Sequence, residues 1–137
     1  MKENKENNNN KQTVFLVDDD EFLLDMYALK FKASGFNVEI AYGAEEAMTQ
    51  LRQGLVPDVL LLDVVMPKTS GFEFLEMLKK ENLLGNSLII VLSNLGQKND
   101  VEKGKKLGAD DYIVKASFTP TEVVEKVKAL LENKNNK

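Results

Sequence analysis

The sequence predicts an α/β fold, a doubly wound parallel sheet of five strands that alternate with helices. Short apolar runs alternate with helical patterns along the chain, which implies parallel pairing through right-handed crossovers. The third and fourth runs are apolar at every position, as is typical of strands covered on both faces. The five runs are Val14–Val17, Val38–Ala41, Val59–Leu62, Leu88–Leu92 and Tyr112–Val114.

Three of the helical patterns have apolar stripes that would pack on the sheet. The stripes consist of Ala44, Ala47, Met48 and Leu51; Phe72, Leu75 and Leu78; and Val123, Val127 and Leu130. The last helix begins at a capping box, Thr119 to Glu122, with proline at its first helical position. The segment 98–107 is rich in lysine and is interrupted by Gly104, and a glycine inside a helix costs about 1 kcal/mol relative to alanine. We therefore expect this helix to be the least firmly held.

Length and composition favour one domain with a substantial core. The chain has 137 residues, of which 43% are hydrophobic. We place the domain at residues 13–131, between an Asn-rich tail at 1–12 and a polar tail at 132–137, and we expect both tails to be disordered.

The missing residue types exclude several kinds of chemistry. Without cysteine there is no disulfide or thiolate zinc site, and without histidine there is no imidazole base, imidazole ligand or phosphohistidine on this chain. A formal charge of -4 gives no electrostatic basis for direct nucleic-acid binding. No apolar stretch approaches the length of a membrane span, so we expect a cytoplasmic protein that does not bind membranes.

Polar side chains follow four of the predicted strands. Asp18 and Asp19 follow the first strand, Asp63 the third, Ser93 the fourth and Lys115 the fifth. Ligands of open parallel sheets gather at the carboxyl ends of the strands, where two groups of carboxylates side by side would hold a divalent metal. Taken singly, each residue has a simpler explanation as a helix-capping acid, a loop carboxylate, a strand-end hydroxyl or a surface lysine.

Four motifs recur in order and make the chain resemble the receiver domain of two-component response regulators. They are Val17-Asp18-Asp19-Asp20; Leu62-Asp63-Val64-Val65-Met66-Pro67 with Gly71 four residues on; Val91-Leu92-Ser93; and Gly108 to Lys115. The resemblance covers Thr13 to about Leu131 and implies a flavodoxin-like (βα)5 sheet with strand order 2-1-3-4-5.

The resemblance also implies roles for the site residues. Asp63 would accept a phosphoryl group, while Asp18, Asp19, Asp63 and the backbone carbonyl of Val65 would bind Mg²⁺. Ser93 and Lys115 would contact the phosphoryl oxygens. Ser93 and Tyr112 would then switch the face formed by the fourth helix, the fifth strand and the fifth helix.

By the same resemblance, the donor would be a sensor histidine kinase or a phosphotransfer protein, and a downstream protein target would read the switched face. The domain would be a signalling protein and not an enzyme. It is either a stand-alone receiver or one excised from a larger protein. Two alternatives are a receiver-like interaction module that is never phosphorylated and an aspartate-nucleophile phosphatase. The phosphatase is disfavoured because Val65 stands where such enzymes carry a second acid.

The sequence departs from the family pattern around the site. Ala116 follows Lys115 where the family usually has a proline after a cis peptide, so this bond is either trans with a changed loop at 116–118 or cis under strain. We expect the changed loop, with Lys115 still directed at the pocket. Val65 and Leu95 flank the phosphoryl position and cannot hold an attacking water, which predicts a long-lived phosphoryl group unless Asn94 orients that water.

Overall fold

The computed structural model describes residues 11–66 and 70–135 of the chain. The strands are β1 (Thr13–Val17), β2 (Asn37–Ala41), β3 (Val59–Leu62), β4 (Leu88–Ser93) and β5 (Asp111–Val114). The helices are α2 (Glu21–Ala33), α3 (Ala44–Arg52), α4 (Gly71–Glu81), α5 (Lys98–Lys106) and α6 (Pro120–Asn135), with a 3₁₀ turn, η1 (Lys115–Ser117), after β5.

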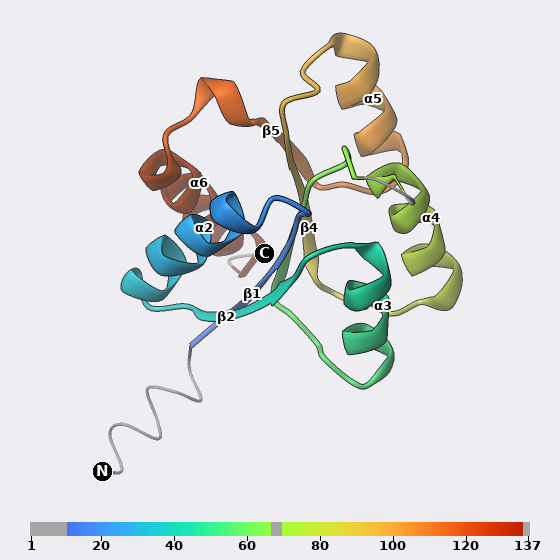
Figure 1. Cartoon of the computed structure of the whole chain (residues 1–137), viewed down its shortest axis with the longest axis horizontal. Helices are drawn as coiled ribbons and strands as arrows, with labels where there is room; N and C mark the ends of the chain where they lie inside the picture. The colour runs from blue at the N-terminus through green and yellow to red at the C-terminus, as the bar shows by residue number, and fades with distance from the viewer. Residues whose placement is uncertain (1–10, 67–69, 136–137) are drawn as a thin grey trace.

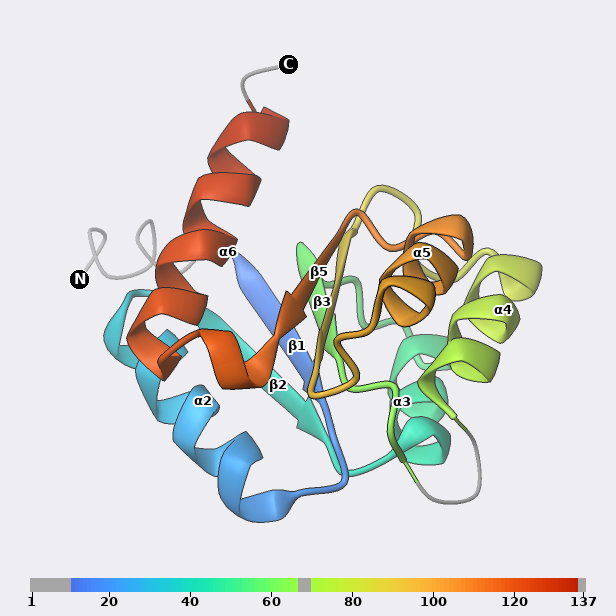
Figure 2. The ribbon, with the colours of Figure 1, turned by 90° about the horizontal axis from the view of Figure 1, so that it is seen from above.

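The strands form one parallel sheet in the order β2-β1-β3-β4-β5, which confirms the predicted fold class. Helices α2 and α6 cover one face, while α3, α4 and α5 cover the other (Figures 1 and 2). Because β1 and β3 are neighbours in the centre of the sheet, the residues that follow them emerge side by side.

Two separate hydrophobic clusters lie on the two faces of the sheet. One joins Phe15, Leu60 and Leu62 to the helices α3 and α4, and the other joins Leu16 and Leu61 to α2 and α6. Alternate residues of one strand therefore enter opposite clusters, which explains why β3 and β4 are apolar throughout.

The predicted capping box at the start of α6 is present. The Thr119 N–H donates to Glu122 Oε1 at 2.8 Å, and the Glu122 N–H donates to Thr119 Oγ1 at 3.1 Å. Two backbone N–H groups at the N-terminus of the helix thus donate to side-chain oxygens, as the sequence pattern indicated.

The predicted tail at 132–137 needs correction, because α6 continues to Asn135. Glutamate and lysine are good helix formers and no proline or glycine stops the helix after Leu131, so the backbone ladder extends past the last core residue. Of the predicted tail at 1–12, residues 1–10 lie outside the described part of the chain, as do 136 and 137.

Candidate functional site

Three carboxylates meet at the carboxyl edge of the sheet, where β1 and β3 end. One oxygen from each of Asp18, Asp19 and Asp63 lies within 4.8 Å of the others. Val17 pairs with Leu62 in the register of β1 and β3, so Asp18 and Asp63 are the next residues on adjacent strands. Asp18 and Asp63 are buried, with exposures of 6% and 8%, while Asp19 is exposed.

Backbone N–H groups orient the two buried carboxylates. The Asp20 N–H donates to Asp18 Oδ1 at 3.0 Å, and the Val65 N–H donates to Asp63 Oδ1 at 3.0 Å. Each acid therefore accepts a hydrogen bond from the residue two positions later in the chain. The Oδ2 atoms of both acids are left to face the pocket between them.

The side chain of Lys115, the first residue after β5, occupies that pocket. Its Nζ donates to Asp18 Oδ2 at 2.8 Å and to Asp63 Oδ2 at 3.1 Å, and its side chain is 9% exposed.

Every peptide bond in the described residues is trans, including the one before Ala116. The chain continues as the turn η1, in which the Phe118 N–H donates to the Lys115 carbonyl at 3.3 Å. The loop at 116–118 is thus changed from the proline form, while Lys115 points into the pocket.

One ammonium group shared by two buried carboxylates leaves the pocket short of positive charge. Burial raises the pKa of Asp18 above its usual value; the hydrogen bond from Lys115 opposes this rise, and the charge of Asp63 adds to it. Burial alone would lower the pKa of Lys115, but its hydrogen bond to Asp18 and the charges of both acids together raise it. The buried trio thus has two carboxyl groups to one ammonium group, and Asp19 adds a further carboxyl group at its rim.

The donor set fits a small hard cation. All the side-chain ligands are carboxylate oxygens, the type that Mg²⁺ prefers, and the exposed Asp19 leaves the site open to water, which Mg²⁺ usually retains. The Val65 carbonyl belongs to the loop that follows Asp63, and Val65 is 52% exposed. These residues can hold a divalent cation at the edge of the sheet.

Ser93 ends β4 fully buried, and its hydroxyl is linked to the following loop. Ser93 Oγ accepts from the Leu95 N–H at 3.2 Å, and the Tyr112 hydroxyl donates to the Leu95 carbonyl at 2.5 Å. Burial raises the pKa of Tyr112, so the phenol is held protonated as the donor. Leu95 thus connects Ser93 to Tyr112 through both of its backbone polar groups.

Leu95 is a residue that the sequence did not mark for this linking role. From the sequence it is only an apolar neighbour of the site, because its contribution here comes from backbone groups that every residue other than proline shares. For Gly104, the sequence predicts only a weak point in a helix. In the structure a Cβ at Gly104 would lie 2.9 Å from Tyr112 Cδ2, so this glycine provides space for the Tyr112 ring.

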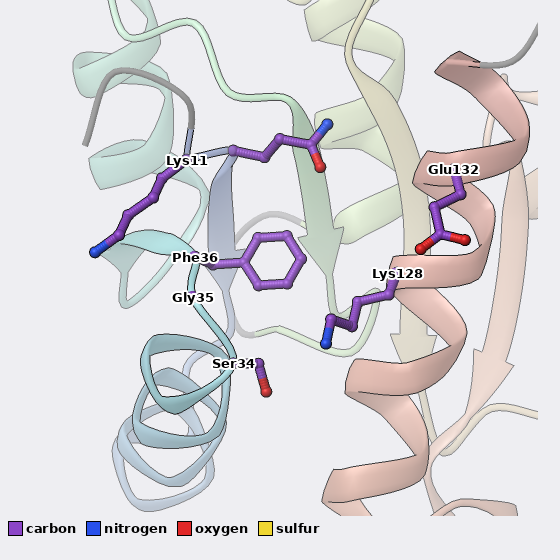
Figure 3. A pocket seen from close by; sticks show the side chains of 7 residues that line it. Lys11, Ser34, Gly35, Phe36, Lys128 and Glu132 are labelled. Atoms are coloured by element: carbon purple, nitrogen blue, oxygen red, sulfur yellow. The ribbon is translucent and has the colours of Figure 1, made fainter. Parts of the chain in front are cut away.

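A solvent-exposed cleft lies away from this site. It has a volume of about 430 Å³ and is open to solvent between the end of α2 and the last turns of α6 (Figure 3). It is lined by Lys11, Gln12, Ser34, Gly35, Phe36, Lys128 and Glu132, none of which belongs to the acidic pocket.

Among the helices of residues 11–66 and 70–135, none combines the length and the apolar composition that a membrane span requires.

The fold and the site define a class of protein. It is a doubly wound α/β domain whose sheet carries, at its carboxyl edge, an acidic pocket that can bind a cation and a buried lysine. The family model for the response regulator receiver domain matches residues 14–128. The chain belongs to the family of response regulator receiver domains, as the sequence motifs indicated.

Curated relatives include transcriptional regulators about twice as long as the match. The phosphate regulon regulator PhoB of Escherichia coli K12 is 32% identical over 118 residues, which are 86% of this chain and 51% of PhoB. The regulator CpxR of the same strain is 36% identical over 118 residues, 86% of this chain and 48% of CpxR. The chain therefore spans about half the length of these relatives.

Solved receiver domains match over nearly their whole length. The receiver domain of the Francisella response regulator 1452 has a TM-score of 0.80 and 30% identity, covering 90% of this chain and 99% of its own. A CheY-like receiver domain protein from Methanospirillum hungatei has a TM-score of 0.82 and 27% identity, covering 92% of this chain and 98% of its own.

Proposed function

We propose that the domain accepts a phosphoryl group on Asp63 from a phosphohistidine of a partner kinase or phosphotransfer protein. The observation that carries this proposal is the buried arrangement of Asp18, Asp63 and Lys115, in which Lys115 Nζ contacts both carboxylates. The chain has no histidine, so the phosphohistidine belongs to the partner.

In the transfer, an Asp63 oxygen forms a bond to phosphorus while the bond between phosphorus and the donor's imidazole nitrogen breaks. The electron pair of that broken bond stays on the imidazole, and Asp63 becomes an acyl phosphate. The Val65 N–H, 3.0 Å from Asp63 Oδ1, keeps the carboxylate oriented toward the pocket. Lys115 lies within reach to neutralise the oxygens of the incoming group.

Mg²⁺ bound by Asp18, Asp19, Asp63 and the Val65 carbonyl would neutralise charge on the transferring group. The anionic balance of the pocket supports this requirement, because a dianionic phosphoryl group could not approach three carboxylates and a single ammonium without a further cation.

For the response, we propose that Ser93 Oγ turns to a phosphoryl oxygen and releases the Leu95 N–H. Since the Leu95 carbonyl is held by Tyr112, this release changes the loop that leads into α5 and the contacts of β5. A downstream protein would read the face formed by α5, β5 and α6. Two apolar side chains beside the pocket, Val65 and Leu95, are 52% and 38% exposed and offer contact area to the donor.

Two alternatives are distinguishable from this proposal. A receiver-like interaction module would keep the fold without accepting phosphate, although the retained set of Asp19, Asp63, Ser93 and Lys115 argues against it. An aspartate-nucleophile phosphatase would need a second acid near Asp63, and Val65 stands two residues later. We expect a phosphoacceptor signalling domain and no turnover of an external substrate.

The test is the intact mass of the protein after incubation with acetyl phosphate and Mg²⁺. We expect one phosphoryl adduct on the wild type, none on Asp63→Asn, none in EDTA, and an unchanged adduct on Asp25→Asn, a surface acid of α2. Transfer from a phosphorylated histidine phosphotransfer domain provides a second donor. Wild type that accepts phosphate from neither donor would reject the proposal in favour of the unphosphorylated module.

A further inference from the structure

The first residue of α4 lies against the backbone that carries the phosphoacceptor. A Cβ built on Gly71 would lie 2.6 Å from the Asp63 carbonyl oxygen. It would also lie 2.4 Å from Val64 Cα and 2.9 Å from Val64 Cγ1. Two of these three contacts are with backbone, which cannot swing aside as a side chain can. No residue larger than glycine fits here without moving the loop or the helix.

The need for glycine at this position is steric and not conformational. In the described residues, the glycines with positive φ are Gly35, Gly54, Gly85 and Gly108, and Gly71 is not among them. Gly71 has the geometry of an ordinary first helical residue after its N-cap, Ser70, whose hydroxyl accepts from the Glu73 N–H at 3.2 Å. Its lack of a side chain therefore serves the close approach alone.

The same contact includes a hydrogen bond that ties the loop to the helix. The Gly71 N–H donates to the Val64 carbonyl at 3.1 Å, and Val64 lies between Asp63 and Val65, two of the residues of the acidic pocket. Asp63 provides the carboxylate, and Val65 provides the N–H that orients it. The next residue of α4, Phe72, is buried in the core, so the helix end is a firm support.

From this packing we infer that Gly71 is a positioning residue of the acidic pocket, setting where the Asp63–Val65 backbone lies and therefore the affinity of the site for Mg²⁺. The inference rests on the proposed use of Mg²⁺ at this pocket. An alanine at 71 would need about 1 Å of extra separation to reach ordinary contact with Val64 Cα. Mg²⁺ accepts ligands only near about 2.0 to 2.1 Å, so a shift of that size moves ligands out of range.

The test compares Mg²⁺ affinity, measured by titration calorimetry, in the wild type and in Gly71→Ala. We expect affinity to fall at least about tenfold in Gly71→Ala, since changing the groups that orient metal ligands typically costs about 10- to 100-fold in metal affinity. Gly43→Ala is the matched control, because nothing lies within 4 Å of a Cβ at Gly43 and its φ of 169° is extended backbone. It should bind Mg²⁺ as the wild type does.

A second control separates positioning from general loss of stability. Val127→Ala removes a fully buried side chain of α6 on the opposite face of the sheet. It should lower the free energy of unfolding in urea but leave Mg²⁺ affinity unchanged. Gly71→Ala should lower affinity out of proportion to its loss of stability.

The double variant Gly71→Ala/Val64→Ala keeps the inference testable if Gly71→Ala alone folds poorly. It relieves the contact with Val64 Cγ1 but retains both backbone contacts, so we expect weakened Mg²⁺ binding to persist. Wild-type affinity in Gly71→Ala or in the double variant would overturn the inference while leaving the proposed function standing. Failure of the wild type to bind Mg²⁺ would overturn both.

Discussion

Replacing Lys115 with methionine should destabilise the domain strongly when no metal is present. Methionine keeps most of the side-chain length and removes the charge that Asp18 and Asp63 share. Both carboxylates would remain buried, 8% and 9% exposed at their side chains, without a cation between them. We therefore expect the cost to come from two unpaired charges and not from lost packing.

The size of the effect follows from the geometry of the pocket. Carboxylate oxygens within 4.8 Å of each other repel by at least about 3.5 kcal/mol at an effective dielectric constant near 20. Removing one partner of a buried ion pair costs about 3 to 5 kcal/mol in other proteins. The variant can avoid the repulsion by protonating one aspartate. At neutral pH, protonating a carboxylate with an unperturbed pKa near 3.8 costs about 4 kcal/mol, which is therefore the upper limit of the loss in stability. We expect a loss of about 3 to 4 kcal/mol in the free energy of unfolding.

Urea unfolding in EDTA at neutral pH measures this loss. Lys126→Met is the matched control, because Lys126 lies 3.8 Å from Asp111 in a partly exposed pair and should cost less than about 1 kcal/mol. Saturating Mg²⁺ should stabilise Lys115→Met more than the wild type, since the ion replaces the missing positive charge. A loss in EDTA no larger than that of Lys126→Met would refute the reasoning that Lys115 compensates the buried acids.

Three further predictions concern the same edge of the sheet. Because the pKa of Asp18 is raised in the fold, its contribution to stability is fully present below its unfolded pKa of about 3.8 and is lost as the pH rises through the folded pKa. Unfolding in EDTA across this range should therefore show the wild type losing stability with rising pH relative to Asp18→Asn, and parallel profiles would contradict this. Tyr112→Phe should lower the free energy of unfolding by about 1 kcal/mol by removing the hydrogen bond to the Leu95 carbonyl, and no change in urea unfolding would show that this bond contributes nothing. The phosphoryl group on Asp63 should outlast that on a Val65→Asn variant, which can hold an attacking water; a half-life of seconds in the purified wild type would reject the prediction.

Patterns that repeat along the chain made the fold and the acidic pocket predictable. Apolar runs such as Leu88–Leu92 specify buried strands, and the acids after β1 and β3 meet because parallel strands present the same end at the same edge. The sequence alone therefore predicts that Asp18, Asp63 and Lys115, which lie far apart in the chain, meet in one pocket.

The remaining features depend on distances that a sequence does not encode locally. The trans bond before Ala116 was one of two open possibilities, since residue identity sets only the cost of each form. The tyrosine bond to Leu95 uses a backbone carbonyl, and the space at Gly104 is visible only once the Tyr112 ring is in place. The predicted domain ends at residue 131, where the spacing of apolar side chains stops, but the backbone hydrogen bonds of α6 continue to Asn135.

The division of the core into two clusters with no shared members makes the two sides of the domain energetically separable. Substitutions more than about 7 to 10 Å apart with no common partner usually add in their effects on stability. The losses of unfolding free energy from a substitution at Leu75 of α4 and from one at Phe31 of α2 should therefore add. At the carboxyl edge of the sheet, Lys115 adds a side-chain link, because its ammonium group contacts Asp18 after β1 and Asp63 after β3. Stabilising substitutions found separately in the two helical layers should therefore combine in one chain with the sum of their individual gains.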